Sequence, residues 1–213
     1  MSIFVNDENI RIDGLQLGPY GTNAYIVRCQ ATGDSLVVDS PGGTEEILCQ
    51  LKGTNPKYIL ITHNHFDHLG ALSELESALR VPVAAHASDA SGLTVQPSIL
   101  LNDGEILSLG NLDVKVLHTP GHTPGSLCFL IGIYLLSGDT IFPGGPGKTG
   151  SPKRFKEIVE SIKRKIFILS DDTLVYPGHG DTTILEKEKA EFAIFSSKSH
   201  SPDLCGDVLW LES

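Results

Sequence analysis

The stretch Thr62-His63-Asn64-His65-Phe66-Asp67-His68 lies directly after apolar residues 58–61, which have the composition of a buried strand. It holds four side chains able to bind a metal ion within six residues, and neither a packed core nor a solvated loop needs them. Imidazole and carboxylate groups suit zinc, iron or manganese, and alternating positions project to opposite sides of an extended segment. One loop of this sequence can therefore serve two metal ions.

Three later segments share the placement of this motif after an apolar run, with glycine or proline on either side. They contain His122 in residues 119–126, Asp139 in residues 137–140 and His179 in residues 176–181. Glycine permits a positive φ and a close approach to a ligand, and proline fixes a turn. Because all four segments follow predicted strands, we expect their seven candidate ligands to meet at one edge of the sheets.

Short apolar runs rich in β-branched residues alternate with helical patterns along the chain. The predicted strands cover residues 24–28, 35–39, 58–62, 81–86, 114–118, 127–131, 134–137 and 174–176. The predicted helices cover residues 45–52 with Thr44 as N-cap, 70–80, 152–169 with Ser151 as N-cap, and 185–196. We predict a single α+β domain over residues 1–213, in which two mixed sheets stack and helices cover their outer faces.

Charge and cysteine use argue against several classes of partner. The 213 residues include 16 lysine and arginine residues against 26 aspartate and glutamate residues, which gives a net charge of −10 with histidine neutral. No basic run offers a footprint for nucleic acid or for an anionic membrane, so we expect neither partner. We find no secretory signal and no apolar stretch long enough to span a membrane. The four cysteines lack metal-site spacing, so we expect reduced thiols in a cytoplasmic protein.

The order of the HxHxDH motif, His122, Asp139 and His179 resembles that of the metallo-β-lactamase superfamily of hydrolases. The resemblance runs from about Tyr20 to His179, and it implies a four-layer αββα sandwich. By this resemblance one metal ion would be bound by His63, His65 and His122, a second by Asp67, His68 and His179, and Asp139 would bridge both. The implied cofactors are two divalent metal ions, zinc first, with iron or manganese also compatible.

The resemblance also implies a mechanism. Two divalent ions lower the pKa of a shared water, so that hydroxide can attack a carbonyl group at neutral pH, and Asp67 could orient that hydroxide as the catalytic residue. Ser126 and Cys128 have no adjacent base, so we interpret them as strand residues rather than nucleophiles. Asp39, at the end of a predicted strand, resembles the family's early aspartate that supports the ligand loops, and a simple cap of the next turn is the alternative.

Within the superfamily, residues 60–63, 120–126 and 138–142 most resemble the glyoxalase II (hydroxyacylglutathione hydrolase) group. The implied reaction is hydrolysis of a small thioester or ester. Residues 180–213 are too few for the helical domain with which glyoxalase II contacts glutathione, so the identity of the thiol carrier stays open.

Three alternatives remain at this point. A persulfide dioxygenase would bind one iron through part of the same motif, although residues 140–148 lack the arginine-rich glycine loop expected of that group. Residues 119–125 resemble the corresponding segment of the lactonases nearly as well as that of glyoxalase II, so a lactonase is a second alternative. A metal-stabilised scaffold without activity would tolerate the loss of a ligand position, and none is lost. In each enzymatic case the substrate is a small molecule, and the sequence does not indicate an oligomeric state.

Overall fold

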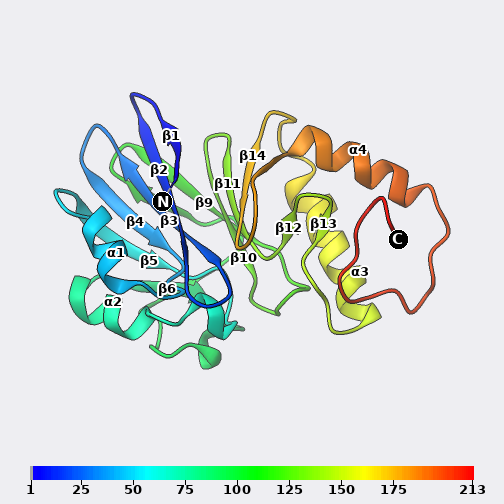
Figure 1. Cartoon of the computed structure of the whole chain (residues 1–213), viewed down its shortest axis with the longest axis horizontal. Coiled ribbons are helices and arrows are strands. Elements are labelled where there is room, and N and C mark those ends of the chain that lie inside the picture. The colour runs from blue at the N-terminus through cyan, green and yellow to red at the C-terminus, as the bar shows by residue number, and fades with distance from the viewer. Residues whose placement is uncertain (1) are drawn as a thin grey trace.

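The computed structural model describes residues 2–213, and seven strands form its first sheet. In chain order and in spatial order they are β1 (Ser2–Asn6), β2 (Ile10–Leu17), β3 (Thr22–Cys29), β4 (Asp34–Val38), β5 (Asn55–Leu60), β6 (Val83–His86) and β7 (Ile99–Leu101). Figure 1 labels six of them, β1 to β6. The pairs from β1 to β4 are antiparallel, whereas the pairs from β4 to β7 are parallel. The mixed pairing predicted from the sequence is confirmed.

Six strands form the second sheet, in the spatial order β15-β14-β11-β10-β9-β8. They are β8 (Ile106–Leu109), β9 (Leu112–His118), β10 (Leu127–Ile131), β11 (Tyr134–Gly138), β14 (Leu174–Pro177) and β15 (Thr183–Ile184). The β11–β14 pair is parallel, and the remaining pairs are antiparallel. A small hairpin of β12 (Ile141–Phe142) and β13 (Gly145–Pro146) follows β11.

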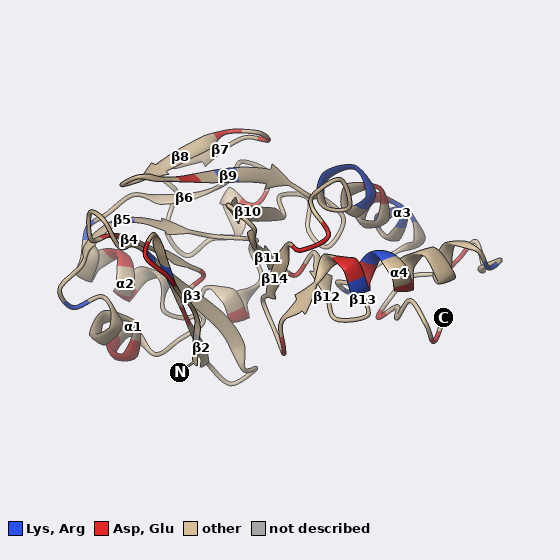
Figure 2. Ribbon diagram, turned by 90° about the horizontal axis from the view of Figure 1, so that it is seen from above, with Lys and Arg blue, Asp and Glu red and all other residues tan. Residues whose placement is uncertain are grey.

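Helices cover the outer face of each sheet. The short helices α1 (Thr44–Gln50) and α2 (Leu72–Leu79) pack on the first sheet, and α3 (Pro152–Ser161) and α4 (Leu185–Ser196) pack on the second. Figure 2, seen from above, separates the two helical layers and shows acidic residues on α1 and basic residues on α3. The four-layer αββα sandwich expected from the family resemblance is therefore confirmed.

Alternation of side chains along the central strands builds three apolar layers. In β3, Tyr25 and Val27 face the second sheet, whereas Ala24 and Ile26 face the layer of α1 and α2. In β10, Phe129 faces the first sheet, and its neighbours turn toward α3 and α4. Because both faces of these strands are buried, their sequences are almost continuously apolar, which is why they could be predicted as strands.

Helix α1 ends two residues before the predicted end at residue 52, and α2 is shorter than the predicted 70–80, while two further differences concern the N-cap of α1 and the end of α3. Thr44 is not an N-cap: Gly43 precedes α1 with a φ of 62°, and the Thr44 hydroxyl donates instead to Glu74 of α2 at 2.6 Å. The predicted helix 152–169 is regular only over α3, and residues 162–166 continue as a π-helical turn. Ser151 does cap α3, since its Oγ accepts a hydrogen bond from the Arg154 backbone at 3.4 Å.

Two further expectations concern the state of the cysteines and the length of the apolar helices. All four cysteines are free, as expected. Among the residues that the structure describes, no helix is long and apolar enough to cross a membrane.

The loop between β9 and β10 packs directly on α3, and this contact should be sensitive to a single methyl group. Gly121 has a φ of 141°, and a Cβ at this position would overlap the backbone and Cβ of Ile158. We expect Gly121→Ala to lower the free energy of unfolding by about 1–3 kcal/mol, measured by urea denaturation. Gly150→Ala is the control, because a Cβ there meets no atom within 4 Å. Equal stability of the two variants would contradict this packing.

Candidate metal centre

Four strand ends bring the predicted ligands to one edge of the sandwich. The HxHxDH loop follows β5 in the first sheet, and its last three residues form a 3-10 turn, Phe66–His68. In the second sheet, His122 lies between β9 and β10, Asp139 follows β11, and His179 follows β14. The structure therefore places the seven side chains together, as the strand-end argument predicted.

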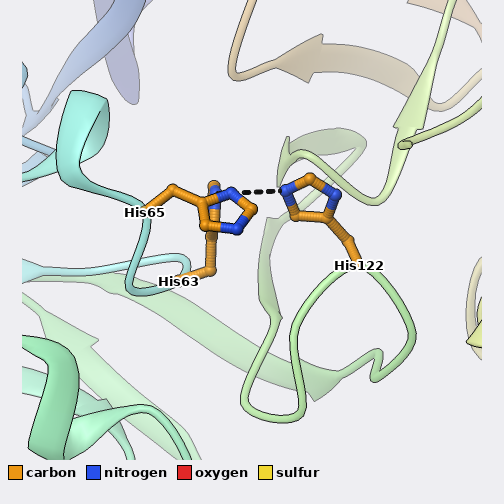
Figure 3. A group of neighbouring side chains, drawn as sticks. All are labelled: His63, His65 and His122. Carbon is orange, nitrogen blue, oxygen red and sulfur yellow. Dashed lines mark hydrogen bonds between the residues drawn. The ribbon is translucent and has the colours of Figure 1, made fainter. Parts of the chain in front are cut away.

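His63, His65 and His122 form the first group (Figure 3). The Nδ1 atom of His65 lies 3.1 Å from Nε2 of His63 and 2.9 Å from Nε2 of His122. Each ring offers one nitrogen to a common point, and these nitrogens lie within 4.8 Å of one another. A compact set of three imidazole nitrogens matches one face of a tetrahedral metal site.

Asp67, His68 and His179 form a second group, to which the same loop contributes two residues. His179 Nε2 lies 3.1 Å from Asp67 Oδ2 and 3.3 Å from His68 Nε2, and His68 Nε2 lies 3.8 Å from the same carboxylate oxygen. His68 is fully buried, while His179 and Asp67 are half-buried. This group offers a mixed nitrogen and oxygen set, which suits a divalent transition metal.

Asp139 lies between the two groups. Its Oδ1 is 3.4 Å from His68 Nε2, and its Oδ2 is 3.5 Å from His122 Nε2. Among the described residues, no hydrogen-bond partner satisfies Oδ1, although this oxygen is buried. A buried, ionised oxygen without a donor is costly unless a cation balances it, so this atom supports the fit of a metal ion.

Hydrogen bonds at Nδ1 orient three of the histidines toward the centre. Nδ1 of His122 donates to the Lys148 carbonyl oxygen at 2.8 Å, and Nδ1 of His63 lies 3.0 Å from the Thr62 hydroxyl. Nδ1 of His68 lies 2.8 Å from Asp39 Oδ2. With a proton held at Nδ1, Nε2 is the nitrogen that faces the site and that would bind a metal ion in the neutral ring, which is the arrangement found around protein-bound metals.

The protonation states of the site follow from burial and neighbouring charges. Burial and the nearby His68 hold the pKa of His63 well below its ordinary value, and burial with His122 lowers the pKa of His65. Burial would raise the pKa of Asp139, but its contact with His68 and the other histidine charges outweigh burial and lower that pKa. Neutral imidazole and ionised carboxylate are the forms that bind metal.

His68 differs from the other histidines. Burial favours the neutral ring, but the carboxylates of Asp39 and Asp139 outweigh burial and raise the pKa of His68 to about 10. The two carboxylates thus create a strongly negative position at His68, which would equally attract a metal cation at Nε2.

Asp39 supports the HxHxDH loop through contacts with Thr62 and His68. Its Oδ1 accepts from the Thr62 backbone at 2.8 Å, and its Oδ2 accepts from the Thr62 hydroxyl at 2.7 Å and contacts His68. Asp39 is 1% exposed and has a φ of 61°, a left-handed conformation that aspartate tolerates better than most residues. Its contacts are those of a residue that supports the loop.

Asp89 was not predicted from the sequence. This buried carboxylate follows β6 and accepts from the Asn64 backbone at 3.1 Å, the Thr123 hydroxyl at 2.6 Å and the Gly125 backbone at 2.8 Å. It therefore ties the HxHxDH loop to the loop of His122. The strand-end position that identified the ligands would also have identified Asp89, but no flanking glycine or proline marks it.

Two cavities open beside the centre and meet at His122. One, of about 320 Å³, is lined by His122, Asp139, His179 and by residues of the β12–β13 hairpin. The other, of about 430 Å³, extends from His65 and His122 to Arg154 of α3. These volumes suit small organic molecules.

Comparison with known proteins defines the family. The sequence profile of the Metallo-beta-lactamase superfamily matches residues 17–179, from the end of β2 to the last predicted ligand. The chain belongs to this superfamily. The probable metallo-hydrolase YqgX of Bacillus subtilis is 33% identical, with 79% of this chain and 90% of that protein covered. The hydroxyacylglutathione hydrolase GloC of Haemophilus influenzae is 29% identical, with coverages of 78% and 89%.

Two similar solved structures agree with the sandwich. TTHA1623 in a di-iron-bound form is 34% identical to this chain, with a TM-score of 0.70 and coverages of 83% of this chain and 96% of that chain. ETHE1 from Myxococcus xanthus is 26% identical, with a TM-score of 0.78 and coverages of 88% and 85%. The superfamily and these relatives identify the chain as a metal-dependent hydrolase, related to glyoxalase II enzymes.

Proposed function

We propose that the protein is a dinuclear metal-dependent hydrolase of small thioesters or esters. The observation that carries this proposal is the position of Asp139, whose two carboxylate oxygens lie within 3.5 Å of a histidine of each ligand group. A single carboxylate between two groups of three ligands is an arrangement that suits two neighbouring divalent ions. The relationship to GloC, which is named a hydroxyacylglutathione hydrolase, supports a thioester as the bond cleaved.

Each side chain has a role in this proposal. The first ion would be bound by His63, His65 and His122, the second by Asp67, His68 and His179, and both by Asp139. The two ions would supply hydroxide at neutral pH and would polarise the carbonyl group of the substrate. Asp67, whose Oδ2 accepts a hydrogen bond from Thr22 at 3.1 Å, is held in place to orient the nucleophile. Asp39 keeps His68 turned toward the centre.

Zinc is the proposed metal, because three imidazole nitrogens form a site that suits it well. The likeness to TTHA1623, which was solved in a di-iron-bound form, makes iron the main alternative. The four free cysteines support a reducing, cytoplasmic location. The convergence of residues from 63 to 179 on one centre supports a single domain over residues 1–213.

A mononuclear iron persulfide dioxygenase is the second candidate function, and the likeness to ETHE1 favours it. Such an enzyme would leave the group of Asp67, His68 and His179 partly unused as ligands. The geometry favours the dinuclear hydrolase, because this group is as compact as the first. A lactonase would use the same centre on a cyclic ester.

Elemental analysis combined with a substrate panel tests the proposal. The panel contains S-lactoylglutathione, other small thioesters, homoserine lactones, a β-lactam and glutathione persulfide, with oxygen uptake recorded for the last. We expect two metal ions per chain and thioester turnover without oxygen uptake. One iron per chain with oxygen uptake would instead establish the dioxygenase, and turnover confined to the lactones would establish the lactonase.

A further inference from the structure

The C-terminal segment, residues 207–209, forms a wall of the cavity beside the metal centre. This cavity of about 320 Å³ is lined by His122, Asp139 and His179 on one side and by Asp207, Val208 and Leu209 on another. Figure 1 shows the red C-terminal segment turning back from the end of α4 toward β13. Residues far beyond the last predicted ligand thus border the space in which a substrate would lie.

Backbone hydrogen bonds fasten this segment to the β12–β13 hairpin and the loop that follows it. Thr149 and Gly206 exchange two bonds of 3.1 and 2.9 Å, and the Trp210 N–H donates to the Gly144 carbonyl oxygen at 2.7 Å. A Cβ on Gly145 would overlap the Val208 carbonyl oxygen, so the two backbones lie in direct contact. The wall is therefore tied at both of its ends.

Buried side chains of α4 complete the attachment. Trp210 is 0% exposed, and its ring packs against Phe192 and Phe195 with centroids 5.1 and 5.0 Å apart. Glu188, also 0% exposed, accepts from the Gly144 backbone at 2.8 Å and from the Thr183 hydroxyl at 2.6 Å. Helix α4, the hairpin and the C-terminal segment thus form one packed unit.

The wall contributes one exposed apolar side chain and one carboxylate to the lining of the cavity. Leu209 remains 42% exposed, although Val208 and Trp210 on either side of it are buried, and it lines the cavity together with Phe142. The Asp207 carboxylate lies 3.3 Å from the ammonium group of Lys148, which also lines the cavity. The rim therefore combines an apolar side chain with a lysine whose charge is balanced.

We propose that Leu209 and Asp207 determine the substrate specificity of the enzyme. Leu209 favours an apolar acyl group, because such a group removes the exposed leucine side chain from water. Asp207 weakens the binding of an anionic thiol carrier, because it repels the anion and occupies the lysine that would attract it. This inference rests on the proposed thioester hydrolysis, and it assigns to that reaction a small apolar acyl group on an uncharged thiol.

The role of Leu209 is tested with acetyl and hexanoyl thioesters of N-acetylcysteamine. We expect the wild-type enzyme to prefer the hexanoyl thioester, and Leu209→Ala to lower kcat/KM for it by roughly threefold to tenfold while changing the acetyl thioester less than about twofold. Leu211→Ala is the matched control, since Leu211 is similarly exposed at 49% but does not line this cavity. An equal loss on both thioesters, or the same pattern in the control, would overturn the assignment.

The role of Asp207 is tested by comparing thioesters that share one acyl group. We expect Asp207→Asn to raise kcat/KM for S-hexanoylglutathione about threefold at low ionic strength and to leave the uncharged N-acetylcysteamine thioester unchanged. High salt should remove the difference, because the charges are exposed and screened. An unchanged value for the glutathione thioester at low salt would show that Asp207 does not select against anions.

A binding measurement separates this inference from the proposed reaction. Calorimetric titration of the metal-loaded protein with hexanoate and with acetate compares two carboxylates that differ only in their apolar tail. We expect tighter binding of hexanoate to the wild-type protein, and a loss of that difference in Leu209→Ala. Absence of thioester turnover would contradict only the proposed function. Equal affinities for the two carboxylates in the wild-type protein would contradict the role of Leu209 in binding an apolar acyl group.

Discussion

Replacing Asp139 with asparagine should lower metal content and turnover together. Asparagine keeps the size of the side chain, but it lacks the negative charge and points an NH₂ group at the histidine nitrogens of one ligand group. Loss of a supporting residue around a metal already costs about 10–100-fold in metal affinity or activity, so we expect a loss of at least that size here. Elemental analysis and kcat/KM for a thioester, measured on the same preparation, provide the test.

The control for this prediction is Asp113→Asn, which makes the same change at an exposed position of β9. It should keep its full metal content and activity. If Asp139→Asn altered only the free energy of unfolding, the centre would be a structural scaffold rather than an active site. Undiminished hydrolysis by this variant would exclude the dinuclear mechanism.

Replacing Asp39 with asparagine should weaken metal binding indirectly, because Asp39 contacts the proposed ligand His68. Asparagine tolerates the positive φ at this position, so the backbone should be preserved. It can accept through one oxygen, whereas the two carboxylate oxygens of Asp39 together contact the Thr62 backbone, the Thr62 hydroxyl and His68 Nδ1. We expect metal affinity to fall about 10–100-fold and the free energy of unfolding to fall by about 1–3 kcal/mol. Chelator competition and thermal unfolding measure the two effects.

Asp13→Asn distinguishes a specific effect from the general cost of altering a buried carboxylate. Asp13 is 1% exposed, like Asp39, but it pairs with Arg11 on β2 at 2.8 Å, away from the centre. We expect this variant to lose stability without losing metal affinity. If the two variants behaved alike in chelator competition, Asp39 would be a structural residue with no influence on His68.

Much of the fold could be predicted because a buried strand appears in the sequence as a short run of apolar residues. The bounds of β10 and α4 agree with the prediction, since neither segment contains a glycine or a proline that would interrupt its pattern. Strand β2 was not among the predicted strands. Apolar and charged residues alternate along it only up to Asp13, and the alternation changes phase at Gly14. The Arg11–Asp13 ion pair allows these charges within the sheet, and such a pairing is visible only in three dimensions.

The π-helical turn after α3 could not be predicted from the periodicity of the apolar residues. The backbone N–H of Phe167 bonds to the carbonyl of Ile162 at 2.8 Å, one residue further than in an α-helix. Ile162 and Ile166 remain buried on one face through this turn, so the apolar stripe continues as it would in a regular helix. Side-chain periodicity alone cannot distinguish the two backbones over so short a segment.

Placement of the candidate ligands was predictable for a topological reason. Strand ends on one edge of a sandwich must lie close together, so a motif found after each of four strands implies one site. Asp89 follows a strand but has no adjacent glycine or proline, so it was not predicted, and the C-terminal wall was not predicted because its role comes from contacts between distant segments. The wall depends on backbone pairing between Thr149 and Gly206, to which almost any side chains could contribute.

The division of the proposed ligands between the two sheets governs how the protein can be assembled. Chain up to β7 supplies His63, His65, Asp67 and His68, and the chain after β8 supplies His122, Asp139 and His179. Neither half contains a complete group of three, so a chain emerging from the ribosome cannot finish either site until its second sheet has docked on the first. Ions bound at the proposed centre would therefore hold the two sheets together at this edge, in addition to the apolar layer that the sheets share.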